Sequence, residues 1–155
     1  MLKHVSGEED KMIKDVSLHG WYWYFSDNAD EIDKSRCGKW MYFFSDQEIA
    51  KAICRKAQVE RVCKICKCTD MKIQETDTGV ICFYTDSNDT EGHKRILKFM
   101  KDNNLIKKTK TGRFYNISFK FDYQTRNGDY GDKFSGKLTL DQFMDLQTGE
   151  FKERS

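Results

Sequence analysis

Residues 115–123 read YNISFKFDY, a stretch in which apolar and polar side chains alternate without a break. Successive side chains of a β-strand point to opposite faces, so this pattern predicts a strand with one apolar and one polar face. The polar face would carry Asn116, Ser118, Lys120 and Asp122. The stretch therefore favours a sheet that is covered on one side only.

Three other stretches are rich in aromatic and β-branched residues, which favour strands. They read WYWYF at 21–25, KWMYFF at 39–44 and VICFYT at 80–85. The first two are expected to pair as a hairpin with a long connection. The continuous apolar run at 80–85 predicts a central strand that is covered on both faces.

Two helices are expected between these strands. Ser45 and Glu48 have the spacing of a capping box, which predicts a helix that continues to about Ala57. A second helix is expected from about Thr90 to Asn103, where an asparagine can end it in the left-handed conformation. The sequence thus predicts an α+β fold, a curved and mostly antiparallel sheet with two main helices packed on one face. We expect residues 1–18 to form a loose N-terminal arm and residues 19–155 a single α+β domain.

The formal net charge of +2 argues against a general nucleic-acid coat protein. No stretch reaches the roughly 20 apolar residues of a membrane span, and residues 1–15 lack the apolar core of a signal peptide. We therefore expect a cytoplasmic protein without a membrane partner, whose six cysteines stay reduced. One local basic surface is predicted, either a solvated helix face or a weak site for nucleic acid or an acidic protein; it comprises Lys94, Arg95, Lys98, Lys101, Lys107, Lys108, Lys110 and Arg113.

Five segments in order resemble signature strands of a known family. They read WY at 23–24, GKW at 38–40, CKIC at 63–66, VICFYT at 80–85 and FKFDYQT at 119–125. Together they resemble the uncharacterised Bles family over about residues 20–130. That family is grouped with the cap-binding translation initiation factor-like fold, which implies a curved antiparallel sheet backed by helices. The family pattern Lys-Pro-Asp is replaced by Lys120-Phe121-Asp122 in this chain.

The resemblance implies a ligand pocket at Lys64, Lys120, Asp122 and Thr125. Two lysines on neighbouring strands, together with Arg126, could hold a phosphate or a carboxylate by charge-assisted hydrogen bonds. Asp122 would orient a lysine or bind a sugar or base. The alternative is a polar strand face that is only solvated.

The three tryptophans, Trp21, Trp23 and Trp40, offer a second kind of contact. A nucleobase stacks favourably on an exposed indole ring, and Trp40 is included among the candidate ligand-binding residues for this reason. All three lie inside expected strands, where packing in the core is the more common role.

Cys63, Cys66 and Cys68 have a compact spacing that is compatible with three ligands of a zinc ion. Cys54 or Cys82 could serve as the fourth ligand. In a regular strand, however, Cys63 would point away from the other two, and buried thiols often act as small apolar groups. We therefore expect neither a metal nor a cofactor.

The sequence contains no phosphate-binding glycine loop, nucleophile elbow or zinc-protease motif. The leading hypothesis is a non-catalytic binding module for a phosphorylated small ligand, a nucleotide or an RNA end. A protein–protein interaction device, such as a small bacterial or phage inhibitor or adaptor, is the first alternative. An enzyme that acts on phosphate-bearing substrates with Lys64 and Lys120 as acid and base is the second.

Overall fold

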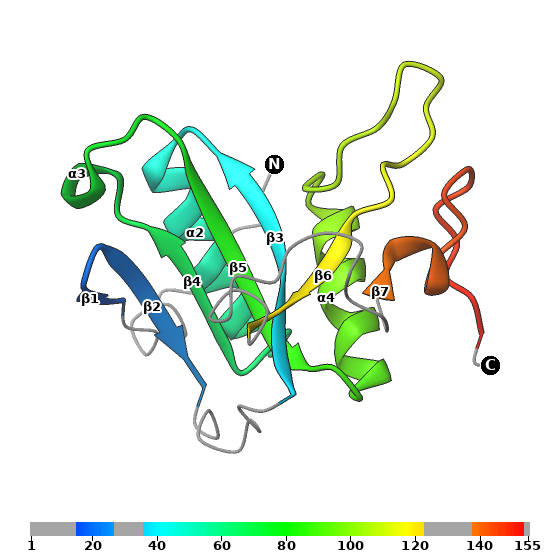
Figure 1. Cartoon of the computed structure of the whole chain (residues 1–155), viewed down its shortest axis with the longest axis horizontal. Coiled ribbons are helices and arrows are strands. Elements are labelled where there is room, and N and C mark those ends of the chain that lie inside the picture. Colours follow the sequence, from blue (N-terminus) through cyan, green and yellow to red (C-terminus); the bar gives the residue numbers. More distant parts are fainter. Residues whose placement is uncertain (1–14, 27–35, 123–137, 154–155) are drawn as a thin grey trace.

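The computed structural model describes residues 15–26, 36–122 and 138–153. Within these ranges the protein has an α+β fold around an open sheet of seven strands, all paired antiparallel, in the order β1-β2-β4-β5-β3-β6-β7 (Figure 1). The expected fold class is thus confirmed. The strands are β1 (Val16–Leu18), β2 (Trp21–Phe25), β3 (Cys37–Phe44), β4 (Ile65–Thr69), β5 (Gly79–Asp86), β6 (Ser118–Phe121) and β7 (Leu138–Thr139).

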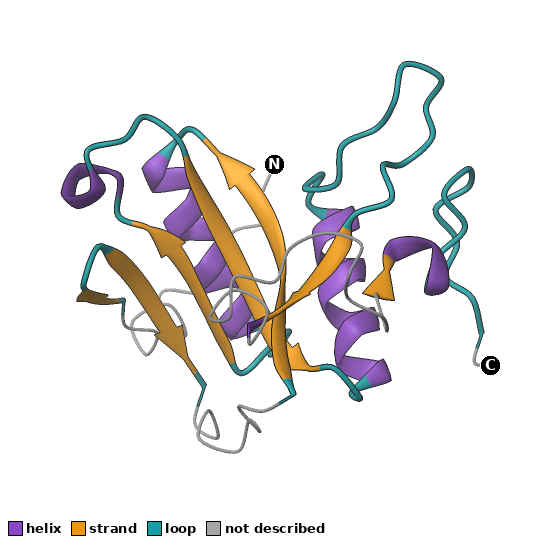
Figure 2. Cartoon of the chain, in the orientation of Figure 1, coloured by secondary structure: helices purple, strands orange, loops and turns teal. Residues whose placement is uncertain are grey.

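The two main helices, α2 (Gln47–Val59) and α4 (Thr90–Asp102), cover the same face of the sheet (Figure 2). Their apolar sides, which include Ile53 and Leu97, pack against Tyr24 of β2 and Phe83 of β5. A short helix, α3 (Met71–Gln74), connects β4 to β5, and a single 3-10 turn (Leu140–Gln142) follows β7. Neither of the two main helices lies on the opposite face of the sheet, where Cys37, Cys82 and Tyr84 form a separate cluster, and we call it the open face.

The expected hairpin between residues 21–25 and 39–44 is wrong. In the structure β2 pairs with β1 and β4, whereas β3 pairs with β5 and β6. The turn before β2, where His19 and Gly20 both have positive φ as in the two-residue turns that close hairpins, pairs β2 with β1, and β4 occupies the other edge of β2. Residues 16–18, which were expected in a loose arm, therefore form the edge strand β1.

Other local expectations are closer to the structure. The run at 80–85 lies in β5, the central strand, as predicted; its residues 81–85 are buried, although the two main helices cover only one face of the sheet. Helix α2 is capped by Asp46, which accepts the N–H groups of Glu48 and Ile49, and not by Ser45, because the helix begins one residue later. The strand expected at 115–123 is shorter, since β6 covers only Ser118–Phe121.

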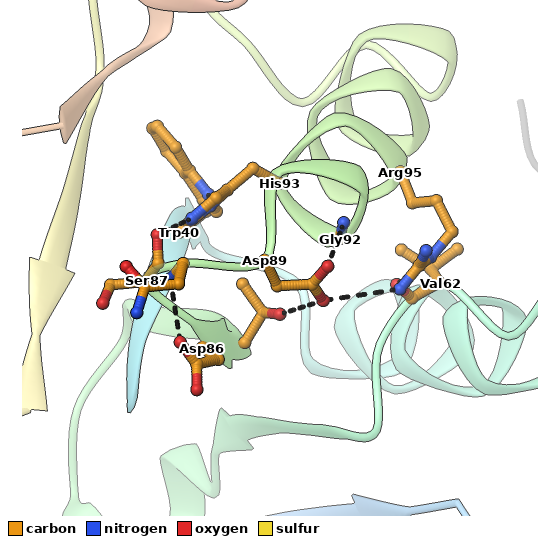
Figure 3. A network of polar contacts seen from close by, with 10 residues as sticks. Trp40, Val62, Asp86, Ser87, Asp89, Gly92, His93 and Arg95 are labelled. Carbon is orange, nitrogen blue, oxygen red and sulfur yellow. Dashed lines mark hydrogen bonds and ion pairs between the residues drawn. The ribbon is translucent and has the colours of Figure 1, made fainter. Parts of the chain in front are cut away.

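A buried polar pair joins β3 to α4 (Figure 3). The indole N–H of Trp40 donates to Nδ1 of His93 over 3.0 Å, and Nε2 of His93 lies 2.9 Å from the carbonyl oxygen of Ser87. The side chains of Trp40 and His93 are 0% and 1% exposed. Because Nδ1 accepts a hydrogen bond, the imidazole proton sits on Nε2 and donates to Ser87, so His93 is neutral.

This pair predicts that acid destabilises the fold. Burial lowers the pKa of His93 below its ordinary value of 6.5, against the opposing effects of the Ser87 carbonyl, Asp89 and Asp86. Below pH 6.5 the unfolded chain binds the proton more readily, so the free energy of unfolding falls as the pH drops through the folded pKa. We expect urea unfolding at stepped pH values to show this fall in the wild type and a shallower one in His93→Gln. Equal slopes for the two proteins would contradict the prediction.

Candidate ligand site on the open face

Three lysines from three strands share the open face. In the ladder, Lys39 of β3 stands opposite Tyr84 of β5 on one side and opposite Lys120 of β6 on the other. Lys67 of β4 stands opposite Cys82 of β5. Directly opposed residues of an antiparallel pair project from the same face, so these side chains gather on the side away from α2 and α4.

Aromatic rings surround the ammonium of Lys67. Its Nζ lies 3.8 Å from the ring centroid of Trp21, 4.7 Å from that of Trp23 and 5.9 Å from that of Tyr84. Lys67 makes no hydrogen bond or ion pair with any residue in the described ranges. Burial lowers its pKa, and the nearby charge of Lys39 acts in the same direction. The rings stabilise the cation through their π faces, but they do not supply N or O acceptors for its hydrogen-bond donors.

Lys39 is held differently. Its Nζ donates to Oδ1 of Asp122 over 2.7 Å and lies 5.7 Å from the centroid of the Tyr84 ring. The residue is only 8% exposed, so this ion pair is partly withdrawn from water. The sequence predicts that Asp122 orients a lysine or binds a sugar or base. In the structure Asp122 orients Lys39.

The open face thus combines amines with flat apolar rings. These residues carry a net positive charge, because Asp122 supplies one carboxylate against the three ammonium groups of Lys39, Lys67 and Lys120. Burial also raises the pKa of the Cys82 thiol beneath them to about 11, so this thiol adds no negative charge near neutral pH. Cationic donors beside aromatic faces provide what a nucleotide requires, a partner for phosphate and a platform for a base.

The residues expected to form one pocket are separated in the structure. Lys120 and Asp122 belong to the open face, whereas Lys64 precedes β4 and lines a different pocket at one end of the sheet. Lys64 and Lys120 are not on neighbouring strands, because β5 and β3 lie between β4 and β6. Trp40 is fully buried on the helix side, so its ring is not accessible to a ligand. Thr125 and Arg126 lie outside the described residues.

The basic residues of 94–113 differ in the contacts that they make. Lys98 pairs with Asp102 at 2.8 Å, and Lys101 donates to the carbonyl oxygen of Gly149 over 2.7 Å. The ammonium of Lys108 lies 4.8 Å from the centroid of the Phe114 ring. Lys107, Lys110 and Arg113 remain exposed, whereas Lys94 lines a pocket beside Phe143.

All six cysteines are buried, four of them in the helix-side core and two, Cys37 and Cys82, on the side of the open face. Cys63 lies before β4, so strand alternation does not govern it, and it joins Cys54, Cys66 and Cys68 in the same cluster. The thiol of Cys66 lies 3.7 Å from the carbonyl oxygen of Cys54 and accepts a contact from the Gln58 amide at 3.5 Å. Among residues 15–26, 36–122 and 138–153, no group of three His, Cys, Asp or Glu side chains is arranged to hold a metal ion.

Lys39 and Lys67, the two central cations of the open face, were not selected from the sequence. Both lie inside quoted segments or next to them, since Lys39 is the middle residue of GKW and Lys67 directly follows CKIC. That Lys67 lies on the same sheet face as Trp21 and Trp23 can be recognised only once β4 is known to pair with β2.

The described part of the chain contains no helix that is both long and apolar enough to cross a membrane. The protein is an α+β domain with an open antiparallel sheet, and the model of one family, described as Basophilic leukemia-expressed protein Bles03, matches residues 27–125. The match spans more than half of the chain, and the protein belongs to the Bles03 family. No curated protein and no solved structure matches the chain.

Proposed function

We propose that the protein is a non-catalytic binding module that captures a nucleotide, or a related phosphorylated ligand, on the open face of its sheet. The ammonium groups of Lys39, Lys67 and Lys120 bind the phosphate, and the rings of Trp21 and Trp23 provide the surface for the base. Asp122 positions the Lys39 ammonium through their 2.7 Å ion pair.

One observation carries this proposal. The Lys67 side chain is partly buried with its ammonium among three rings, while no carboxylate of the described residues pairs with it. Keeping a cation in such a place lowers its pKa, and a bound anion would offset that cost. A salt bridge that served only stability would instead bring a carboxylate to the lysine.

The family resemblance supports the same location. The cap-binding-factor-like fold with which this family is grouped implies a curved antiparallel sheet whose one face is backed by helices, and we propose that the ligand occupies the other face. The open face of this protein has the corresponding position, and it carries two tryptophans and three lysines. We propose on this basis that the ligand is a nucleotide or an RNA end and not a simple inorganic anion.

Replacing Lys67 by methionine tests the proposal. Methionine retains the apolar contacts with the rings and removes the charge. A hydrogen bond to a charged group contributes about 1.5–3 kcal/mol, so we expect nucleoside monophosphates to bind roughly tenfold to a hundredfold more weakly. Isothermal titration with the four common ribonucleoside monophosphates measures the change.

Lys110→Met is the matched control, because Lys110 is an exposed turn residue that is not among the residues of the open face. Its affinity should equal that of the wild type, and the urea midpoints of both variants should remain close to the wild-type value. If no monophosphate binds the wild type, or if Lys67→Met binds as tightly, the proposed function is wrong.

A further inference from the structure

The side chain of Lys67 has a chemistry that binding an anion does not use. It is partly buried, and its Nζ lies 3.8 Å and 4.7 Å from the ring centroids of Trp21 and Trp23. These rings replace part of the water that would solvate an ammonium group, and neither indole supplies a nitrogen or oxygen acceptor. An amine in such surroundings gives up its proton more readily than the amine of an exposed lysine.

A second cation of the open face acts in the same direction. The centroid of the Tyr84 ring lies 5.9 Å from Nζ of Lys67 and 5.7 Å from Nζ of Lys39. Two like charges near one ring disfavour each other, so Lys39 favours the uncharged form of Lys67. The carboxylate of Asp122 is paired with Lys39 at 2.7 Å, and it offsets this effect only in part.

The other strands around Lys67 do not restore its charge. Cys82 of β5, directly opposite Lys67, would favour the ammonium as a thiolate, but burial raises the pKa of Cys82 to about 11. Strand β2 consists of uncharged residues. Burial, together with the charge of Lys39, therefore lowers the pKa of Lys67. Near neutral pH a larger fraction of this amine is uncharged than of an exposed lysine.

We propose that Lys67 is a covalent capture site, whose amine forms a Schiff base with the carbonyl carbon of a small aldehyde. The nitrogen lone pair attacks the carbonyl carbon, a C–N bond forms, and the carbonyl oxygen takes a proton from the nitrogen. That oxygen then leaves as water with a second proton from solvent, and an iminium ion remains. Lysines that are partly desolvated or lie beside another cation suit this chemistry, because only the uncharged amine is a nucleophile. The aldehyde is small because rings crowd the amine.

This capture goes beyond the proposed function and does not require a nucleotide. The two are linked by the proton of Lys67. A phosphate bound at this lysine favours the ammonium form, which is not a nucleophile. A bound nucleotide would therefore slow the reaction with an aldehyde.

Competitive reductive methylation tests the proposal. Formaldehyde in limiting amount, with cyanoborohydride, converts each Schiff base into a methylated lysine, and mass spectrometry of proteolytic peptides identifies the lysines that reacted. At pH 7 we expect Lys67 to react several times faster than Lys110, which is exposed. The ratio of the two rates should shrink as the pH approaches 10.5, the ordinary pKa of lysine, because Lys110 then loses its proton as well.

Lys39→Met should lower this ratio at pH 7, because the variant removes the neighbouring cation while the carboxylate of Asp122 still favours the Lys67 ammonium. Circular dichroism checks that the variant is folded. Equal rates for Lys67 and Lys110 in the wild type would overturn the proposal. A ratio that is unchanged in a folded Lys39→Met protein would overturn it too.

A repeat with the four ribonucleoside monophosphates at saturating concentration separates this proposal from the proposed function. If Lys67 reacts first and the nucleotides slow it, both stand. If Lys67 reacts first and the nucleotides leave its rate unchanged, the capture site stands and the proposed function is wrong. If Lys67 reacts no faster than Lys110 although a nucleotide binds through Lys67, the capture site is wrong and the proposed function stands.

Discussion

Replacing Trp40 by alanine is expected to lower the free energy of unfolding by about 3–5 kcal/mol, the usual cost of truncating a large buried aromatic residue. The indole is fully buried and packs against the rings of Phe119 and Phe143. Its removal also leaves Nδ1 of His93 without its donor inside the core, which adds the cost of an unpaired polar atom. Urea unfolding followed by far-ultraviolet circular dichroism measures the change.

Trp21→Ala is the matched control on the other side of the sheet. Trp21 is only partly buried, so its loss of stability should be clearly smaller. Its effect on nucleotide affinity should be larger, because its ring contacts Lys67. Trp40→Phe, which keeps most of the packing, should remain folded and bind nucleotides like the wild type. A binding defect in a folded Trp40→Phe protein would contradict the assignment of Trp40 to the core.

Replacing Gly38 by alanine is the second substitution with a large expected effect. A Cβ at this position would lie 2.4 Å from the Phe119 ring and 2.6 Å from the backbone oxygen of Lys120. Strand β6 would have to move away from β3, and overpacking of this kind usually costs about 1–3 kcal/mol. We expect a loss at the upper end of that range, because one of the colliding atoms belongs to the backbone. The midpoint of thermal unfolding, read by circular dichroism, gives the size of the loss.

The same substitution should also weaken nucleotide binding in the fraction that remains folded. Asp122 directly follows β6, and the pairing of β6 with β3 sets its place beside Lys39. Gly112→Ala provides the comparison, since its Cβ would meet no atom within 4 Å and only its positive φ opposes the change. Equal losses of stability for the two variants would show that the close approach of β6 to Gly38 is unimportant.

Local patterns predicted the individual elements well but not their partners. The alternation of apolar and polar residues around residue 119 correctly placed Phe119 and Phe121 on the apolar face. Successive side chains of a strand point to opposite faces, so the sequence of that strand alone indicates which of them are buried. The hairpin between β2 and β3 failed because strand pairing depends on contacts between distant segments. In this chain β4 and β5 are inserted between those two strands.

The same difference between local patterns and strand pairing applies to the candidate site. Lys120 and Asp122 were found because they share one strand face, which a single segment reveals. Lys67 was missed because its significance comes from Trp21 and Trp23 on a strand more than forty positions earlier in the chain. Lys64 was selected by resemblance, and its neighbours Arg36 and Arg95 come from segments that no local pattern connects with it.

The unequal distribution of the three tryptophans has a practical consequence. One indole is sealed in the interior, while the other two lie around the Lys67 ammonium on the opposite side of the sheet. The protein therefore carries built-in optical reporters. A soluble quencher or a bound nucleotide would change the fluorescence of Trp21 and Trp23. The red shift of Trp40 fluorescence would follow only the unfolding of the protein. Ligand binding and unfolding can therefore be recorded in one unlabelled sample.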